Sequence, residues 1–338
     1  TNSWIWQKRS ESLKIGIIGS GQFGASLAHN FSKNLKEINI WNRSNINKDI
    51  IIRKLNSLSG ENLINQLSPY FKIRRSILNV VENSDIILLC IKAQSLINFL
   101  RENYSFFENK PLIFCSKGID SESCLFQTQI GEQFLNKNKL LALSGPGFAS
   151  DIIKQKPIAL SLACNNQNLG KKVQNIISSP SIRIYLNNDL IGTQLGGALK
   201  NVIAIACGVA DAKGLGESAK SAIITRGFYE IRQIGKALGC QVETLFGLSG
   251  LGDLSLTCNS KLSRNYNFGI NICENIKKQK NYKETIEGKK TANAAVLISK
   301  KYQLDLPIIQ TVNDLIDENI EISKAIQNLL ERPLKNET

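Results

Sequence analysis

The chain has 338 residues, more than one ordinary hydrophobic core accommodates, so we expect two domains. Hydrophobic residues make up 42% and charged residues 21%, which argues against a disordered chain. The formal net charge is +14, which compositional bias or a partner such as nucleic acid, an anionic membrane or a phosphorylated small molecule could explain. The lysines are scattered and no RNP-like or zinc-finger pattern is present, so we expect no nucleic-acid partner.

Cysteine and histidine usage limits the chemistry. The eight cysteines form no CxxC pair, and most lie in apolar runs such as residues 86–90 and 112–115. This pattern predicts reduced, buried thiols in a cytoplasmic protein, with no metal site. The single histidine, His29, lies on a predicted helix, so we do not expect His-based catalysis. The N-terminal residues contain no apolar signal-peptide core, and no signal peptide is expected.

Short apolar runs alternate with helical patterns through the first half of the chain. Near-continuous apolar runs are typical of parallel strands that are buried on both faces. The alternation therefore predicts a doubly wound sheet flanked by helices. The expected strands are residues 14–19, 38–41, 86–91, 112–116 and 140–144, with two more at the far edge in 157–164 and 182–186.

Beyond about residue 190, strand-like runs largely vanish and long helical stretches follow. We therefore expect an α/β chain with an N-terminal Rossmann-type domain over residues 1–190. An all-α domain for substrate binding and catalysis should follow over residues 191–338.

Residues 190–210 are apolar enough and long enough to span a membrane. They nevertheless contain a central Lys200 with polar neighbours, and no second span is present. These features favour a buried central helix of the second domain, without stable membrane insertion.

Residues 19–24 read Gly-Ser-Gly-Gln-Phe-Gly, a GxGxxG loop between a predicted strand and a predicted helix. In a dinucleotide site Gly19 permits the tight turn, Gly21 lets the backbone approach a pyrophosphate, and Gly24 lets helix and strand pack closely. The helix N-terminus adds free N–H groups and a positive dipole. We therefore expect a dinucleotide loop here, the alternative being a glycine-rich turn without a ligand.

The second predicted strand ends in Trp41-Asn42-Arg43, where NAD-selective folds usually carry an acid that binds the ribose hydroxyls. No acid is present, and Arg43 could pair with a 2′-phosphate. This favours NADP, or use of both NADP and NAD. A solvated arginine is the alternative.

Lys200 is the only charged residue between Asp189 and Asp211. An ammonium in an apolar setting loses hydration, which lowers its pKa. A lysine tuned in this way suits general acid/base chemistry on a carbonyl/alcohol pair. We therefore predict that Lys200 is catalytic, the alternative being a side chain that extends to the surface.

Further candidate side chains lie in three other segments. Asp253, in a glycine-rich stretch, could hold Lys200 or a substrate hydroxyl, or be structural. Ser263-Arg264-Asn265 suits a phosphate, with a helix N-cap as the alternative for Ser263. Lys117 follows a predicted strand, at the edge where open α/β sheets bind ligands.

These motifs resemble, in order, those of the bacterial-type NAD(P)-dependent glycerol-3-phosphate dehydrogenases over roughly residues 14–310. The resemblance implies reversible reduction of dihydroxyacetone phosphate to sn-glycerol 3-phosphate with NADPH or NADH, for glycerophospholipid synthesis. It also implies a homodimer. The matching segments are GSGQFGASLA, KGID, LSGPGFA, GALKNVIAIACG, ITRGFYEI, GLSGLGDLSLTC, SRNYNFG and IEGKKTA.

The resemblance also implies roles for individual residues. Lys200 matches the proton donor and acceptor, with Asp253 and Lys117 as further catalytic residues. The implied substrate contacts are Lys117, Gly145, Gly147, Lys200, Asn201, Asp253, Thr257, Ser263, Arg264 and Asn265. The implied cofactor contacts are Gly19, Gly21, Gln22, Phe23, Gly24, Arg43, Lys117, Ala149, Arg264, Thr285 and Glu287.

The chain departs from the family pattern at three places. Phe23 stands where Trp is usual, Gly147 where Ser, Asn or Thr is usual, and Ile91-Lys92 where Val-Pro is common. We expect these changes to affect affinity and cofactor preference more than reaction type.

Two other functions fit parts of the pattern. A related two-domain reductase of a 3-hydroxy acid or of ketopantoate also uses a helical lysine, but its carboxylate substrate does not require the set at 263–265. A non-catalytic dinucleotide sensor could lose Lys200 and Asp253, and both are present.

Overall fold

The computed structural model describes residues 13–274 and 286–330. The chain divides into two units, which are described separately. Unit 1 comprises Thr1–Ser116 and Gln127–Thr193, and unit 2 comprises Lys117–Phe126 and Gln194–Thr338.

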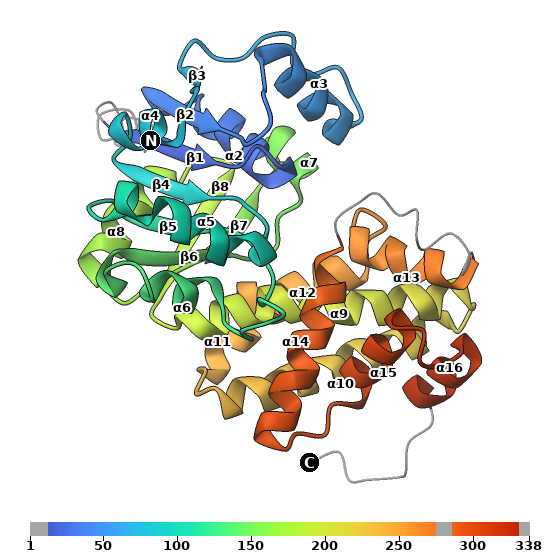
Figure 1. The fold of residues 1–338 in the computed structure, drawn as a ribbon. Helices are drawn as coiled ribbons and strands as arrows, with labels where there is room; N and C mark the ends of the chain where they lie inside the picture. Colours follow the sequence, from blue (N-terminus) through green and yellow to red (C-terminus); the bar gives the residue numbers. More distant parts are fainter. Residues whose placement is uncertain (1–12, 275–285, 331–338) are drawn as a thin grey trace. The chain divides into compact units, whose positions relative to one another are not determined.

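Unit 1 is built on an eight-stranded sheet with the order β3-β2-β1-β4-β5-β6-β7-β8 (Figure 1). All neighbouring strands run parallel except β6 and β7, which are antiparallel. The part from β3 to β6 has the strand order of the dinucleotide-binding doubly wound fold, which reverses between β1 and β4. The strands are β1 (Lys14–Ile18), β2 (Glu37–Trp41), β3 (Phe71–Ile73), β4 (Ile86–Leu89), β5 (Leu112–Phe114), β6 (Leu140–Ser144), β7 (Ile158–Cys164) and β8 (Ile182–Asn187).

Helices connect the strands of unit 1 and pack on the sheet. The first of them, α2, packs on β1 and β2, and α8 packs on β7 and β8. These contacts cover the apolar faces that the sequence pattern predicts for the strands. The helical segments are α2 (Gln22–Phe31), α3 (Lys48–Ser59), α4 (Ile77–Glu82), η1 (Ala93–Ser95), α5 (Leu96–Asn103), η2 (Tyr104–Phe107), α6 (Gln127–Glu132), η3 (Lys137–Lys139), α7 (Ala149–Ile153) and α8 (Gln167–Ile177).

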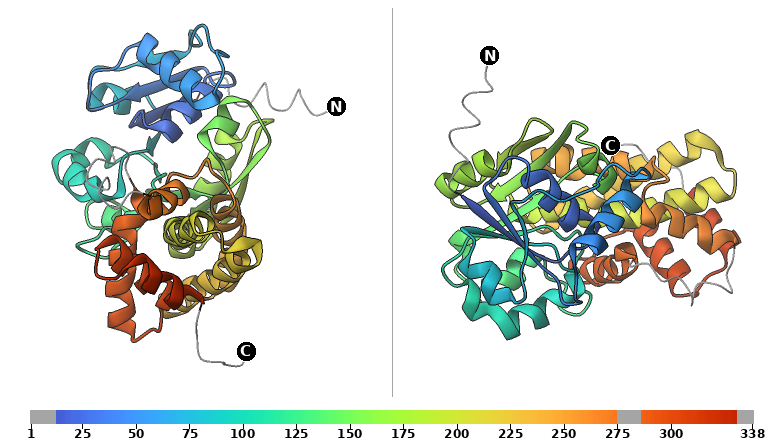
Figure 2. Two further views of the ribbon diagram at one scale, coloured as in Figure 1. Left: turned by 90° about the vertical axis from the view of Figure 1, so that its right-hand side faces the viewer. Right: turned by 90° about the horizontal axis from the view of Figure 1, so that it is seen from above.

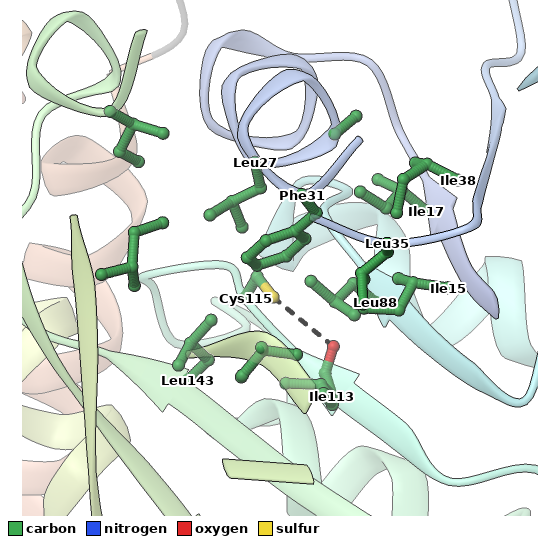
Figure 3. Packing of buried hydrophobic residues seen from close by; sticks show 14 of the residues in the cluster. Ile15, Ile17, Leu27, Phe31, Leu35, Ile38, Leu88, Ile113, Cys115 and Leu143 are labelled. Carbon is green, nitrogen blue, oxygen red and sulfur yellow. Dashed lines mark hydrogen bonds between the residues drawn. The ribbon is translucent and has the colours of Figure 1, made fainter. Parts of the chain in front are cut away.

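The core of unit 1 lies between α2 and the strands beneath it. Phe31 of α2 points into a cluster that includes Ile15 and Leu88 from two neighbouring strands (Figure 3). The Cys115 thiol lies in the same cluster and donates to the Ile113 carbonyl over 3.6 Å. This core fixes the strand ends at which the glycine loop begins.

Unit 2 is helical, and its described residues contain no strand. The predicted combination of a Rossmann-type sheet and an all-α C-terminal part is confirmed. Its helices are α9 (Leu190–Ala212, whose first turn lies in unit 1), α10 (Gly216–Ala237), α11 (Val242–Phe246), the π-helical turn η4 (Leu248–Gly252), α12 (Asp253–Cys258), α13 (Arg264–Glu274), α14 (Glu287–Tyr302), α15 (Pro307–Ile316) and α16 (Ile322–Leu330).

Helix α9 is the one helix among the described residues that is long and apolar enough to cross a membrane. Of its most apolar 18-residue window, 89% is buried inside the protein. Figure 2 (left) shows it nearly end-on, with other helices of unit 2 around it. The prediction of a buried central helix is confirmed.

The structure shows two features that were not expected from the sequence, namely strand β3 and the unit to which residues 117–126 belong. Strand β3 was not predicted, because its three residues, Phe-Lys-Ile, are too few to show an alternating pattern. Residues 117–126 belong with the helical unit although unit 1 flanks them on both sides in the sequence. The expected domain boundary between residues 190 and 191 falls within the first turn of α9, and it stays a prediction.

Candidate active site

The glycine loop of unit 1 requires glycine at two positions for steric reasons. Gly19 has φ +106°, and a Cβ there would lie 2.6 Å from the Cys90 carbonyl oxygen. A Cβ on Gly24 would collide with the Gly19 carbonyl, so α2 could not lie this close to the loop. A Cβ on Gly21 would meet nothing within 4 Å, so the backbone there is open to a ligand. This arrangement fits the pyrophosphate of a dinucleotide.

The N-terminus of α2 adds an electrostatic element. No side chain caps the helix, and its first turn contains no acidic residue. The first N–H groups of a helix lack intrahelical acceptors and carry a partial positive charge. Gln22, which begins the helix, is exposed, whereas Phe23 packs partly on the core. The helix end is therefore suited to an anion.

Asn42, at the end of β2, supports the loop from the side. Its Oδ1 accepts a hydrogen bond from the Ser20 backbone N–H over 3.2 Å, and its Nδ2 donates to the Ser44 hydroxyl over 2.6 Å. The neighbouring Arg43 is exposed and belongs to none of the ion pairs found in the described part of the chain. The β2 end thus offers a cation and no acid.

Unit 2 brings together two lysines on one carboxylate. The Lys200 ammonium donates to Asp253 Oδ1 over 2.5 Å and to the Thr257 hydroxyl over 2.9 Å. The Lys117 ammonium donates to the other carboxylate oxygen, Asp253 Oδ2, over 2.7 Å. An ammonium has three N–H donors, so these bonds leave Lys200 one donor for a substrate oxygen. We call Lys117, Lys200, Asp253 and Thr257 the lysine cluster.

Close backbone packing sets the position of the lysine cluster. Gly196 lies one turn before Lys200 on the same face of α9, and a Cβ there would lie 2.5 Å from the Ser249 carbonyl oxygen. The absent side chain allows η4 to approach the helix closely. Asp253 follows η4 directly and Thr257 follows one turn later, so both reach the Lys200 ammonium.

Burial sets the electrostatics of the cluster. Asp253 is fully buried and Lys200 is 7% exposed. Burial lowers the pKa of Lys200 to about 8, while the Asp253 carboxylate opposes this shift and the nearby Lys117 ammonium adds to it. A pKa near 8 lets Lys200 donate and accept a proton close to neutral pH.

A chain of buried amides runs from Lys117 to α14. Asn201 Nδ2 donates to the Lys117 carbonyl over 3.2 Å, and Asn265 Nδ2 donates to Asn201 Oδ1 over 2.9 Å. Asn265 Oδ1 then accepts from the Gly288 N–H over 3.0 Å. These bonds hold the Lys117 backbone and the start of α14 to the central helix.

The three residues of the predicted phosphate set, 263–265, make different contacts in the structure. The Ser263 hydroxyl accepts from the Tyr266 N–H over 3.2 Å, so the N-cap interpretation applies to Ser263. Asn265 belongs to the amide chain. Arg264 begins α13, is partly buried, and makes no ion pair with any described residue. Arg264 is thus the cationic member of the set, and its contact with a phosphate stays a prediction.

The remaining predicted contacts lie at element ends. In unit 1, Gly145 and Gly147 follow β6, and Ala149 begins α7. In unit 2, Glu287 is the first residue of α14. Thr285 lies outside the described residues. The assigned roles of all these residues stay predictions.

Two cysteines next to the lysine cluster were missed by the sequence analysis. Cys207 and Cys258 are fully buried, and Cys258 neighbours Cys207, Lys200 and Asp253. Burial, reinforced by Cys207, raises the pKa of Cys258, so its thiol stays neutral beside the Lys200 ammonium. Helical spacing could have revealed Cys207, which lies two turns after Lys200 on the same face of α9.

The single histidine lies in unit 1, on α2. His29 is buried in α2, and burial, assisted by the Lys33 charge, lowers its pKa to about 4, so it is neutral near pH 7. Within residues 13–274 and 286–330, no cluster of three or more His, Cys, Asp or Glu side chains could hold a metal ion.

Known proteins resemble this chain over nearly its full length. Residues 14–170 match the family described as NAD-dependent glycerol-3-phosphate dehydrogenase N-terminus, and residues 189–327 match its C-terminus. Glycerol-3-phosphate dehydrogenase (NAD(P)+) of Brucella ovis is 37% identical over 332 residues, which cover 96% of this chain and 99% of the relative. The enzyme of the same name from a Ruegeria species is 37% identical over 328 residues, covering 96% and 100%.

A solved structure gives the same result. The crystal structure of glycerol-3-phosphate dehydrogenase from Coxiella burnetii superposes with a TM-score of 0.84 at 26% identity, covering 95% of this chain and 99% of that chain. Sequence matches in both halves and this agreement in fold lead to one conclusion. The chain belongs to the NAD(P)-dependent glycerol-3-phosphate dehydrogenase family.

Proposed function

We propose that this chain catalyses the reversible reduction of dihydroxyacetone phosphate to sn-glycerol 3-phosphate with NADPH or NADH. The lysine cluster carries the proposal: a buried lysine with a pKa of about 8 shares one buried carboxylate with a second lysine. Reduction of a ketone needs a group that protonates the developing alkoxide, and this cluster provides one.

The two units supply different parts of the chemistry. The proposed domain of residues 1–190, which contains most of unit 1, binds the dinucleotide through Gly19, Gly21 and the N-terminus of α2. Unit 2 holds the substrate and moves the proton. The nicotinamide, when bound, supplies the hydride to the ketone carbon.

Lys200 acts as the proton donor in the reducing direction. Its hydrogen bonds to Asp253 and Thr257 use two of its three N–H donors, and the third can donate to the substrate oxygen. Asp253 holds the Lys200 ammonium in place and keeps it charged. Lys117, on the same carboxylate, adds a second positive charge that stabilises the developing alkoxide.

Arg264 binds the substrate phosphate, because its guanidinium presents paired donors to an anion. Binding energy from this remote group orients the carbonyl for reaction. Asn201 and Asn265 act through the amide chain, which holds the Lys117 backbone.

The enzyme uses NADP and NAD, with NADP favoured, because the β2 end has Arg43 and no acid. It acts in the cytoplasm as a homodimer without stable membrane insertion, and its product feeds glycerophospholipid synthesis. Similarity to the family over nearly the whole chain favours this reaction over reduction of a 3-hydroxy acid or ketopantoate.

The test is steady-state oxidation of NADPH and of NADH by dihydroxyacetone phosphate and by ketopantoate. We expect kcat/KM for dihydroxyacetone phosphate to exceed that for ketopantoate by at least about 100-fold, since a phosphate site left empty is costly. Equal or faster turnover of ketopantoate would instead identify the related reductase.

A further inference from the structure

Lys54 reaches the glycine loop from a different helix. Its ammonium donates a hydrogen bond to the Ser20 carbonyl oxygen over 2.5 Å. Lys54 lies on α3, which packs beside α2, and Ser20 stands between the first two glycines of the loop. A cation therefore lies directly on the backbone that is expected to face the dinucleotide. Nothing in the sequence distinguishes Lys54 among the 42 lysines and arginines.

The Lys54 ammonium has no carboxylate within ion-pair distance in residues 13–274 and 286–330. Burial lowers its pKa, and no carboxylate contributes to that shift. Partly buried charges are normally paired, because they have lost part of their hydration. A bound anion would provide the missing partner.

The surroundings of Ser20 indicate which anion would pair with Lys54. The Ser20 N–H is bonded to Asn42 at the end of β2, and its carbonyl is bonded to Lys54. In this fold the end of the second strand faces the adenosine ribose hydroxyls. Lys54 and Asn42 are thus hydrogen-bonded to the two backbone groups of the same loop residue, Ser20, next to the expected position of the 2′ oxygen. An acid would repel a 2′-phosphate there, whereas the neutral Asn42 amide does not.

The same residue also carries an unused polar group. The Ser20 hydroxyl is buried and has no hydrogen-bond partner among the described residues. Among the described residues this hydroxyl therefore lacks a hydrogen-bond partner, as expected of a residue that binds a ligand.

We propose that Lys54 determines cofactor choice by binding the 2′-phosphate of NADP(H), together with Arg43. This inference rests on the proposed dinucleotide site of unit 1. NAD(H) has no 2′-phosphate, so Lys54 discriminates between the two cofactors. If Lys54 only supported the loop through the Ser20 carbonyl, both cofactors would depend on it equally.

The experiment measures binding of NADP+ and NAD+ separately by calorimetry, without substrate, for the full chain and two variants. Lys54→Met keeps the length and apolar stem of the side chain but removes the charge. Arg53→Met is the matched control, because Arg53 is the exposed neighbour on the same helix and loses the same charge. Titration with 2′,5′-ADP and 5′-AMP isolates the contribution of the 2′-phosphate.

We expect Lys54→Met to weaken NADP+ and 2′,5′-ADP binding by roughly tenfold or more, as loss of a charge-assisted bond to phosphate requires. NAD+ and 5′-AMP binding should change by less than about threefold, and Arg53→Met should change neither. Equal weakening of both cofactors, or no change in either, would overturn the proposal for Lys54 and leave the enzyme assignment intact. Failure of the unaltered chain to bind any dinucleotide would overturn the proposed function itself.

Discussion

Lys200 and Asp253 form a buried ion pair in which Nζ and Oδ1 lie 2.5 Å apart. Removing two charges from water costs more than a simple pair usually returns, so a buried ion pair is weak evidence for stability. Here the carboxylate is also bonded to Lys117, and the pKa of Lys200 falls to about 8. Titratable groups perturbed in this way are typical of active sites.

Substitution of Lys200 tests its role as proton donor. Lys200→Ala should lower kcat for dihydroxyacetone phosphate by about 10²–10⁴-fold, the usual contribution of a general acid. Dinucleotide binding should stay nearly unchanged, because the glycine loop belongs to unit 1. Lys220→Ala is the matched control, since Lys220 is as buried as Lys200 but pairs with Glu217 on α10. Full activity of Lys200→Ala would refute the assignment.

The pH dependence follows from the protonation state of Lys200. Reduction needs the ammonium form, so kcat/KM should be level below about pH 8 and fall by roughly tenfold per pH unit above it. Oxidation of glycerol 3-phosphate should show the opposite dependence. Thr257→Val removes an acceptor that favours the charged form, so the fall should begin at lower pH. A profile that Thr257→Val leaves in place would assign the fall to another group.

Gly196 tests whether close packing positions the lysine cluster. In Gly196→Ala the new methyl would lie 2.5 Å from the Ser249 carbonyl, so η4 must move and shift Asp253. We expect a loss of about 1–3 kcal/mol in the free energy of unfolding, together with a lower kcat. Gly170→Ala in α8 is the control, because its methyl would meet neighbours at an ordinary 3.4 Å. Equal behaviour of the two variants in urea unfolding and turnover would contradict this explanation.

Glu230 stabilises unit 2 away from the lysine cluster. Its buried carboxylate accepts hydrogen bonds from the Ile308 and Ile309 N–H groups, over 2.8 and 3.0 Å, at the start of α15. Glu230→Gln replaces one acceptor by a donor and should lower the free energy of unfolding by about 1–3 kcal/mol. Urea denaturation checks this, with the exposed Glu243→Gln expected to change stability by less than about 0.5 kcal/mol. Similar stability of the two variants would show that the cap contributes little.

The fold class and the burial of α9 could be predicted from the sequence alone. Continuous apolar runs indicate strands that are buried on both faces, and seven of the eight strands were predicted from them. The isolated charge of Lys200 in an apolar helix was also visible, because burial of an ammonium is unusual. The short strand β3 carried no such signal.

The contacts that complete the candidate site could not be predicted from single segments. Lys54 and Ser20 are 34 positions apart, and Lys117 and Asp253 are 136 apart, so only the folded chain shows that they meet. Ser263 gave an ambiguous signal, because a hydroxyl before a helix suits both a cap and a ligand. The hydrogen bond to the Tyr266 N–H provides the evidence for the cap.

The division of the chain has a consequence for recombination between relatives. Because Lys117–Phe126 folds with unit 2 but is encoded within unit 1, no single crossover separates the two units. A chimaera joined at residue 190 would take Lys117 from one parent, and Lys200 and Asp253 from the other. Gene fusion that exchanges cofactor specificity between homologues would therefore combine lysines from two parents in one lysine cluster. Transfer of Lys117–Phe126 together with the helical part would avoid this.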